Sequence, residues 1–188
     1  MNIDYTILLI ADVVRVVVSY LILITNIRPY LKLLLLILTD GIDCNVLHFF
    51  KLYNKRPICK NDPKTSYDVV DKITDSTSYI LIFIMLINTK LFTYNERQFI
   101  LLLLVYRLIG VFIFVLTKNR KMLFYFPNFF LEMTLLLVLA KEFKFNYKPF
   151  IILVVIFKLM QEYILHYSKS YDKLKRIIYK NIPVIIND

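Results

Sequence analysis

Apolar residues gather in six long runs along the chain, with short polar gaps between them. The runs cover residues 5–25, 30–50, 68–88, 97–117, 121–141 and 148–168. A helix rises about 1.5 Å per residue, so about 20 apolar residues span the roughly 30 Å of hydrocarbon in a bilayer. The pattern therefore predicts an all-α integral membrane protein, with six transmembrane helices in one bundle over residues 1–168.

The gaps between the runs carry residues that end helices. Arg28 precedes Pro29, and the residue before a proline avoids helical geometry. The longest gap, residues 51–67, holds five basic residues and two prolines. Residues 169–188 are basic and partly amphipathic, so we expect a cytosolic tail that lies on the membrane surface.

The composition narrows the class of protein. Of the 188 residues, 59% are hydrophobic, and the mean hydropathy is +0.61, which is too apolar for a soluble domain. The net charge of +10 would suit a nucleic-acid-binding protein, but the basic residues cluster in the gaps, as in cytosolic loops of membrane proteins. We therefore expect no nucleic-acid partner. Cys44 and Cys59 show neither metal-ligand spacing nor a disulfide framework.

The basic residues also predict the orientation. Thirteen Lys and Arg residues lie in the second loop, the fourth loop and the tail, on the side that also holds the amino terminus. The other side holds seven. Because the more basic side faces the cytosol, we expect both termini in the cytosol. The acidic residues that flank the second loop then open to the cytosol as well.

Four of these acidic residues have helical spacing. Asp40 and Asp43 are three apart at the end of the second run, and Asp71 and Asp75 are four apart at the start of the third. Each pair lies on one helical face. Two helices joined by one loop can therefore aim four carboxylates at one point. A carboxylate costs about 2.5–3.5 kcal/mol at the centre of a spanning helix, and its preferred partner is a hard divalent cation.

Helix capping accounts for part of this acidity. Residues 65–68 fit a capping box, which assigns Asp68 to the start of a helix. The helix dipole also favours Asp71 if it lies in the first turn. Asp75 lies too far along the helix for a cap, and Asp40 and Asp43 lie at the unfavourable end of theirs. Capping and the dipole therefore leave at least two of the four carboxylates unexplained.

Other polar residues within the runs have two interpretations each. Arg15 either pairs with Asp12 or faces an anionic substrate near the carboxylates. Arg107, one turn before Gly110, either pairs with Glu132 or contacts a phosphate. Lys158 and Glu162, four residues apart, are most simply an internal ion pair.

From Asp40 to Asp75 the sequence resembles the CDP-alcohol phosphatidyltransferase family. The family signature is D-x-x-D-G-x-x-A-R, a loop, and then G-x-x-x-D-x-x-x-D, over the second and third of six membrane helices. The four aspartates match its four acids, and Arg15 stands where many members carry an arginine. Four positions differ, since the family has Gly, Ala, Arg and Gly at the positions of Cys44, Leu47, His48 and Tyr67.

The resemblance implies a transferase of phospholipid biosynthesis. Such an enzyme moves a phosphatidyl (substituted phosphate) group from a CDP-linked donor, such as CDP-diacylglycerol, to an alcohol acceptor and releases CMP. It assigns Asp40, Asp43, Asp71 and Asp75 to Mg²⁺ or Mn²⁺, and Asp75 also to the role of general base. Membrane lipids surround such a protein, and the resemblance also suggests a homodimer. The residues expected at the two substrates are, for the donor, Arg15, Gly41, Cys44, His48 and Tyr67, and, for an acceptor phosphate, Arg107, Arg120 and Lys121.

Two other classes of protein remain open. A relative that lost CDP binding would keep the helices and act as a membrane scaffold or partner subunit. A small ion or proton carrier would use the buried acids directly. The chain shows no internal repeat, a common mark of carriers, and a carrier would leave the paired spacing beside a cytosolic loop unexplained.

Overall fold

A computed structural model describes residues 3–40 and 66–164, and within these ranges the chain is helical, with short turns between helices and no strand. The helices are α1 (Ile3–Ile24), α2 (Pro29–Asp40), α4 (Ser66–Ile87), α5 (Tyr94–Thr117), α6 (Lys121–Tyr125), α7 (Phe129–Phe143) and α8 (Lys148–Glu162). The predicted all-α class is confirmed for this part of the chain.

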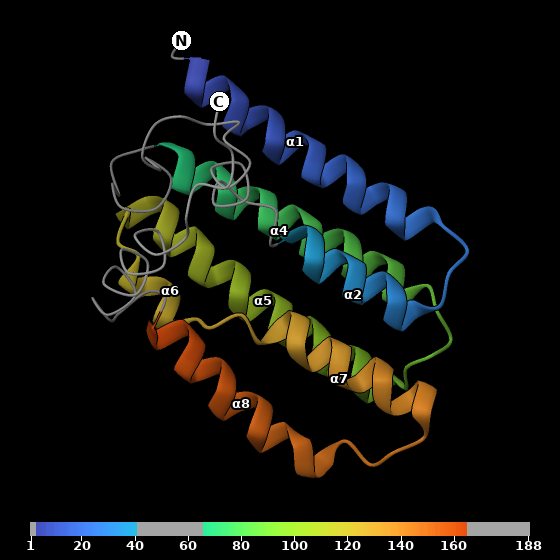
Figure 1. The fold of residues 1–188 in the computed structure, drawn as a ribbon. Helices are drawn as coiled ribbons and strands as arrows, with labels where there is room; N and C mark the ends of the chain where they lie inside the picture. Colours follow the sequence, from blue (N-terminus) through green and yellow to red (C-terminus); the bar gives the residue numbers. More distant parts are fainter. Residues whose placement is uncertain (1–2, 41–65, 165–188) are drawn as a thin grey trace, which may run out of the picture.

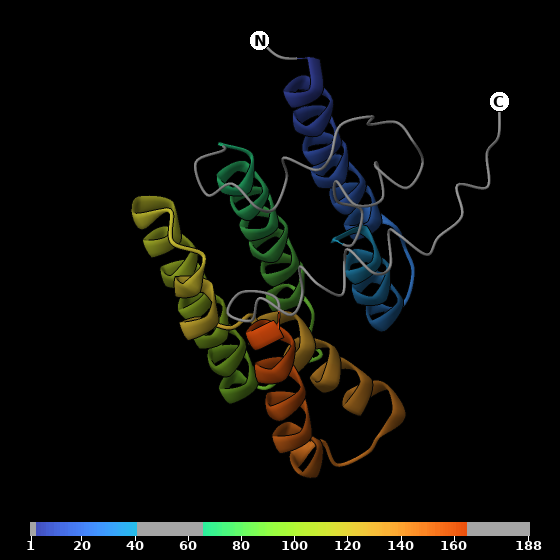
Figure 2. The same ribbon diagram turned by 60° about the vertical axis from the view of Figure 1, so that its left-hand side comes forward.

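The helices form one bundle, with α1 at one edge and α8 at the other (Figures 1 and 2). Helix α1 packs mainly against α4 and also touches α2, while α7 contacts α2, α5 and α8. Short connections between α1 and α2 and between α4 and α5 make each pair antiparallel neighbours. The amino-terminal half of α4 therefore lies beside α1 and near the end of α2.

The helix ends follow from local chemistry. Pro29 begins α2, a position where its missing N–H costs nothing. Thr93 caps α5, and the Glu96 side chain accepts the Thr93 N–H in return, which completes a capping box. Lys118 ends α5 in a left-handed conformation (φ 52°).

The predicted single helix over residues 121–141 is wrong in one respect, because the chain breaks between α6 and α7. Pro127 cannot donate a helical hydrogen bond, and Phe126 before it leaves helical geometry with φ −123° and ψ 65°. The freed carbonyl oxygen of Phe126 accepts a 2.8 Å hydrogen bond from Arg107 Nη1 of α5. A buried arginine therefore stabilises the break.

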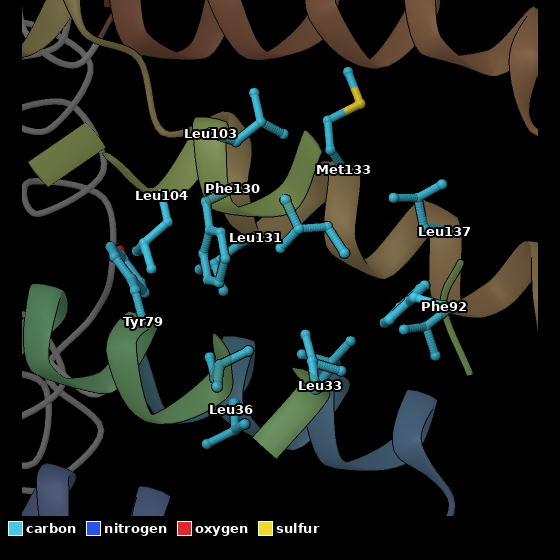
Figure 3. Close-up of a cluster of buried hydrophobic side chains, with 14 residues drawn as sticks. Leu33, Leu36, Tyr79, Phe92, Leu103, Leu104, Phe130, Leu131, Met133 and Leu137 are labelled. Carbon is cyan, nitrogen blue, oxygen red and sulfur yellow. The ribbon is translucent and has the colours of Figure 1, made fainter. Parts of the chain in front are cut away.

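The main apolar core lies between α2, α4, α5 and α7 (Figure 3). Leu33 and Leu36 of α2 meet Tyr79 of α4, Leu104 of α5 and Phe130 of α7. Buried positions three, four and seven residues apart recur on α4, α5 and α7, and Leu33 and Leu36 of α2 are three apart, as expected for one buried stripe per helix. This packing fixes α4 against its neighbours and so positions the polar residues near its amino-terminal end.

Two helical stretches in the described ranges are long and apolar enough to cross a membrane. They are Tyr94–Thr117, with 24 residues, and Lys121–Phe143, with 23 residues, the second of which includes the break at Pro127. Helix α5 also exposes large apolar side chains along one face, including Leu102, Ile109 and Phe112. Such a face is typical of contact with lipid or with another protein.

A polar cluster joins α7 to α8. Lys158 Nζ lies 2.6 Å from Glu132 Oε1 and 3.5 Å from Glu162 Oε1, so the predicted pair of Lys158 and Glu162 is present. Glu162 Oε1 also accepts the backbone N–H of Asn128 at 3.1 Å. The interpretation that pairs Glu132 with Arg107 is wrong, because Glu132 binds Lys158 and Arg107 binds a backbone carbonyl.

Candidate functional site

Asp71 and Asp75 lie one turn apart near the amino-terminal end of α4, on the face that packs against α1. Both are almost fully buried, with 5% and 4% of their surface exposed. Spacing of four residues places the two carboxylates one above the other on a helix. The predicted convergence of this pair is therefore present in the fold.

Arg15 of α1 binds both carboxylates. Its Nη2 donates to Asp75 Oδ1 at 2.8 Å, and its Nη1 lies 3.3 Å from Asp71 Oδ1. The planar guanidinium presents several donors at once, which suits a bridge between two carboxylates. Asp12, the alternative partner on α1, is more distant, with Oδ1 3.6 Å from Nη2. Arg15 thus faces the acidic pair on α4 as well as its own neighbour.

Lys72 binds the same two carboxylates from the other side. Its Nζ lies 2.7 Å from Asp71 Oδ2 and 2.5 Å from Asp75 Oδ2. All four carboxylate oxygens of Asp71 and Asp75 therefore contact a cation, the Oδ1 atoms through Arg15 and the Oδ2 atoms through Lys72. One positive centre, the Lys72 ammonium, meets both carboxylates at once.

The cluster keeps an excess of acid. Among the described residues, three carboxylates, those of Asp12, Asp71 and Asp75, meet two cations, those of Arg15 and Lys72. With every group ionised, one negative charge is left over. Asp12 Oδ2 is also buried without a hydrogen-bond partner among the described residues. A buried polar atom without a partner is costly, so Asp12 Oδ2 is a point in the described part of the cluster that suits a further cation or donor.

The end of α2 approaches this cluster. Leu36 lines a cavity of about 10 Å³ together with Arg15, Ser19 and Ser78, which is room for about one water molecule. Asp40 ends α2 one turn beyond Leu36. The described end of α2 therefore lies near Arg15 and near Ser78 of α4.

Several predicted site residues lie outside the described residues or have side chains outside them. Asp43 and the expected donor contacts Gly41, Cys44 and His48 belong to the first group, as does the tail over residues 169–188. Tyr67 and Asp68 lie in the first turn of α4, and Asp40 in the last turn of α2, by their backbone alone. Their expected roles stay predictions.

The three residues expected at the acceptor lie on α5 and α6. Arg107 is buried on α5 and holds the break between α6 and α7, as described above. Arg120 and Lys121 stand where α6 begins. Leu123 of α6 packs with Val111 and Phe114 of α5, and Val69 of α4 packs against this group. Arg120 and Lys121 thus share with Asp71 the end of the bundle at which α4 begins.

Sequence reasoning missed Lys72. The signal was present, since a lysine three residues before Asp75 lies on the same helical face as that carboxylate. Lys72 also directly follows Asp71, and neighbours along a helix normally point in different directions. Its long side chain closes the distance, which spacing rules do not capture.

The donor set suits Mg²⁺ or Mn²⁺ in part. Among the described residues, no group of three His, Cys, Asp or Glu side chains is arranged to hold a metal ion. Two of the four signature carboxylates, Asp71 and Asp75, do converge on a single cation, with oxygen ligands that hard divalent ions prefer. The unpaired Oδ2 atom of Asp12 and the excess negative charge of the described cluster also favour a bound cation. Of the predicted ligands, the described side chains therefore supply two carboxylates, Asp71 and Asp75, whose oxygen atoms suit a divalent ion.

In comparisons with known proteins, no protein-family model, no curated protein and no solved structure matches this chain.

Proposed function

We propose that this protein is a membrane-embedded, metal-dependent transferase of phospholipid biosynthesis. It transfers a phosphatidyl group from a CDP-linked donor, such as CDP-diacylglycerol, to the hydroxyl group of an alcohol, and releases CMP. The observation that supports this most directly is the pair Asp71 and Asp75, whose four carboxylate oxygens all face cations at the buried junction of α1 and α4. A site built for cations on a bundle of this pattern suits pyrophosphate chemistry.

Asp40, Asp43, Asp71 and Asp75 would hold Mg²⁺ or Mn²⁺. When bound, the metal would offset the charge of the pyrophosphate and stabilise the charge that develops during displacement. The carboxylates of α4 are held in place by Arg15, so they need little reorganisation. The chain thus supplies a preorganised set of oxygen ligands.

Asp75 is the general base in this proposal. It accepts the proton of the acceptor hydroxyl as the acceptor oxygen forms a bond to the phosphorus next to the lipid. The bond from that phosphorus to the bridging oxygen breaks, and the oxygen leaves with CMP. Arg15 stays within reach of Asp75 throughout, since Nη2 lies 2.8 Å from Oδ1. Arg107, Arg120 and Lys121 would hold a phosphate on the acceptor.

Six helical segments would cross the membrane, namely α1, α2, α4, α5, α6 with α7, and α8. Two long apolar stretches support this topology, as do exposed apolar side chains such as Val13 on α1, Phe112 on α5 and Phe157 on α8. Both termini and the acidic cluster would face the cytosol. The cluster would then receive its nucleotide from the aqueous side and its lipid from the bilayer.

One observation favours an alternative. Lys72 and Arg15 already occupy every carboxylate oxygen of Asp71 and Asp75. In a relative that had lost catalysis, such a closed ion cluster would simply fasten α1 to α4, and the protein would act as a membrane scaffold or partner subunit. The two functions differ in whether a divalent ion enters the cluster.

The deciding experiment measures CMP release. The full-length protein in detergent micelles would be incubated with CDP-diacylglycerol, Mg²⁺ or Mn²⁺, and a panel of alcohols including glycerol 3-phosphate and inositol compounds. We expect metal-dependent CMP release that Asp75→Asn abolishes and Glu142→Gln, at an exposed surface pair, leaves intact. A folded protein that binds neither metal nor donor would favour the scaffold.

A further inference from the structure

Lys72, like Asp12, belongs to the acidic cluster but has no role in the proposed mechanism. Its ammonium lies 2.7 Å from Asp71 Oδ2 and 2.5 Å from Asp75 Oδ2. The family signature leaves the residue after its third acid unspecified, so the resemblance assigns no role to this lysine. Its side chain is only 17% exposed, so solvent screens this contact less than it screens a surface ion pair.

The position of Lys72 coincides with the place where a metal would bind. A divalent ion shared by Asp71 and Asp75 needs one oxygen from each carboxylate. The Oδ1 atoms face Arg15 and the Oδ2 atoms face Lys72. Two positive centres cannot share the Oδ2 atoms at bonding distance because their repulsion is large in a buried site. The ammonium and the metal therefore exclude each other at these atoms.

We infer that Lys72 is a built-in competing cation, which occupies the metal position on Asp71 and Asp75 and must be displaced before a divalent ion can bind there. This inference rests on the proposed function, since it takes the acidic pair to be a metal site. Arg15 does not need to move, because it contacts the opposite carboxylate oxygens. The two cations of the cluster thus have different roles: Arg15 positions the carboxylates, and Lys72 competes with metal ions for them.

The displacement of Lys72 by a metal ion couples metal binding to donor binding. A displaced ammonium loses two charged hydrogen bonds and needs a new acceptor. The phosphate oxygens of an anionic donor provide one, and the flexible lysine stem lets the ammonium follow. Metal and donor therefore favour each other's binding, since each relieves part of the cost of moving Lys72. The resting site therefore binds free metal ions weakly, and it binds them more tightly once the anionic lipid is present.

The test measures Mn²⁺ binding without any substrate. Full-length wild type, Lys72→Met and Lys72→Gln in detergent micelles would be titrated with Mn²⁺, and free Mn²⁺ would be followed by electron paramagnetic resonance. We expect both variants to bind Mn²⁺ at least about tenfold more tightly than wild type, the equivalent of one charged hydrogen bond. The matched control is Lys141→Met, which removes a lysine from another ion pair, with Glu96, and should leave the affinity unchanged.

Two sets of outcomes separate this inference from the proposed function. If wild type binds Mn²⁺ at a site that Asp75→Asn removes, but neither Lys72 variant binds more tightly, then Lys72 is not a competitor and the metal site stands. If no folded variant binds Mn²⁺ at an Asp75-dependent site, both the metal-dependent function and the inference are overturned. Circular dichroism of each variant checks helicity, and Lys72→Gln keeps the test valid if Lys72→Met fails to fold.

Discussion

Arg15 of α1 and Asp75 of α4, 60 residues apart in the chain, are joined by a contact of 2.8 Å between Nη2 and Oδ1. Their side chains are 3% and 6% exposed. A buried pair of this kind adds little net stability, but removal of one partner leaves a charge that water cannot reach. The contact therefore makes the position of the Asp75 carboxylate on α4 depend on the position of α1.

Arg15→Met should destabilise the fold strongly. The change leaves Asp71 and Asp75 buried with Lys72 as their remaining described cation, and loss of one partner of a buried pair costs about 3–5 kcal/mol. The matched control is Arg28→Met, since Arg28 is 69% exposed where it pairs with Glu142 and such pairs contribute about 0–1 kcal/mol. Thermal unfolding in detergent, followed by circular dichroism, compares the two. Equal losses of stability would show that the buried cluster does not hold α1 in place.

Asp75→Asn should abolish transferase activity while the protein stays folded. Asparagine keeps the shape of the side chain but cannot accept the hydroxyl proton, and loss of a general base lowers the rate by about 10²–10⁴-fold. CMP release at saturating Mg²⁺ measures the effect. Activity that survives in the purified variant would remove Asp75 from the mechanism and assign the proton to another group.

Asp68 and Asp71 lie three residues apart at the start of α4, yet they should respond differently to substitution. Helix α4 begins at Ser66, so Asp68 lies in its first turn, where a carboxylate satisfies or faces the free amides. Asp71 contacts Arg15 and Lys72. We expect Asp68→Asn to retain metal-dependent activity and Asp71→Asn to lose it. Equal losses in the two variants would mean that the site extends over the first turn.

Hydrophobic periodicity predicted the helices well because each apolar run must bury or embed one face. The break between α6 and α7 also had a signal, Pro127, which runs of apolar residues on both sides concealed. A window that averages about 20 residues for membrane spans is blind to a three-residue interruption. The sequence did not show that the carbonyl oxygen of Phe126, which has no partner within the helix, accepts a hydrogen bond from Arg107.

Partner choice among charged residues was harder to predict than helix position. Within one helix, spacing suggested Arg15 with Asp12 and Lys158 with Glu162, and both contacts exist at 3.6 and 3.5 Å. The shorter contacts cross between helices, to Asp75 at 2.8 Å and to Glu132 at 2.6 Å. Helix packing decides such pairs, and packing depends on the whole set of apolar contacts rather than on local spacing.

Cys44→Gly should improve binding of the CDP-linked donor. In the family that the sequence resembles, glycine at this position lets the nucleotide approach the helix closely, and a cysteine side chain would fill part of that space. Titration of CDP-diacylglycerol with Mn²⁺ into wild type and Cys44→Gly measures the change, with Cys59→Gly as the control for loss of a cysteine. If neither wild type nor Cys44→Gly binds the donor while metal binding is intact, the scaffold function is favoured.

Gly110→Ala should destabilise the region around the break between α6 and α7. A Cβ atom at Gly110 would lie 2.1 Å from Phe126 Cβ and 2.7 Å from Phe126 Cγ, well inside van der Waals contact. Phe126 cannot move aside easily, because Arg107 holds its carbonyl oxygen and its ring packs against Tyr106. Overpacking of this kind costs about 1–3 kcal/mol.

The matched control for Gly110→Ala is Leu116→Ala on the same helix, where the leucine is 67% exposed. Thermal unfolding in detergent should show a lower midpoint for Gly110→Ala than for Leu116→Ala. The acceptor affinity adds a functional readout, since Arg107, a proposed contact of the acceptor phosphate, lies one turn before Gly110 and donates a hydrogen bond to the carbonyl oxygen of Phe126. If α5 and Phe126 separate to admit the methyl group, Arg107 loses its carbonyl partner and the Michaelis constant for a phosphorylated acceptor rises. An unchanged midpoint together with an unchanged Michaelis constant would show that the close approach at Gly110 supports neither the fold nor the acceptor site.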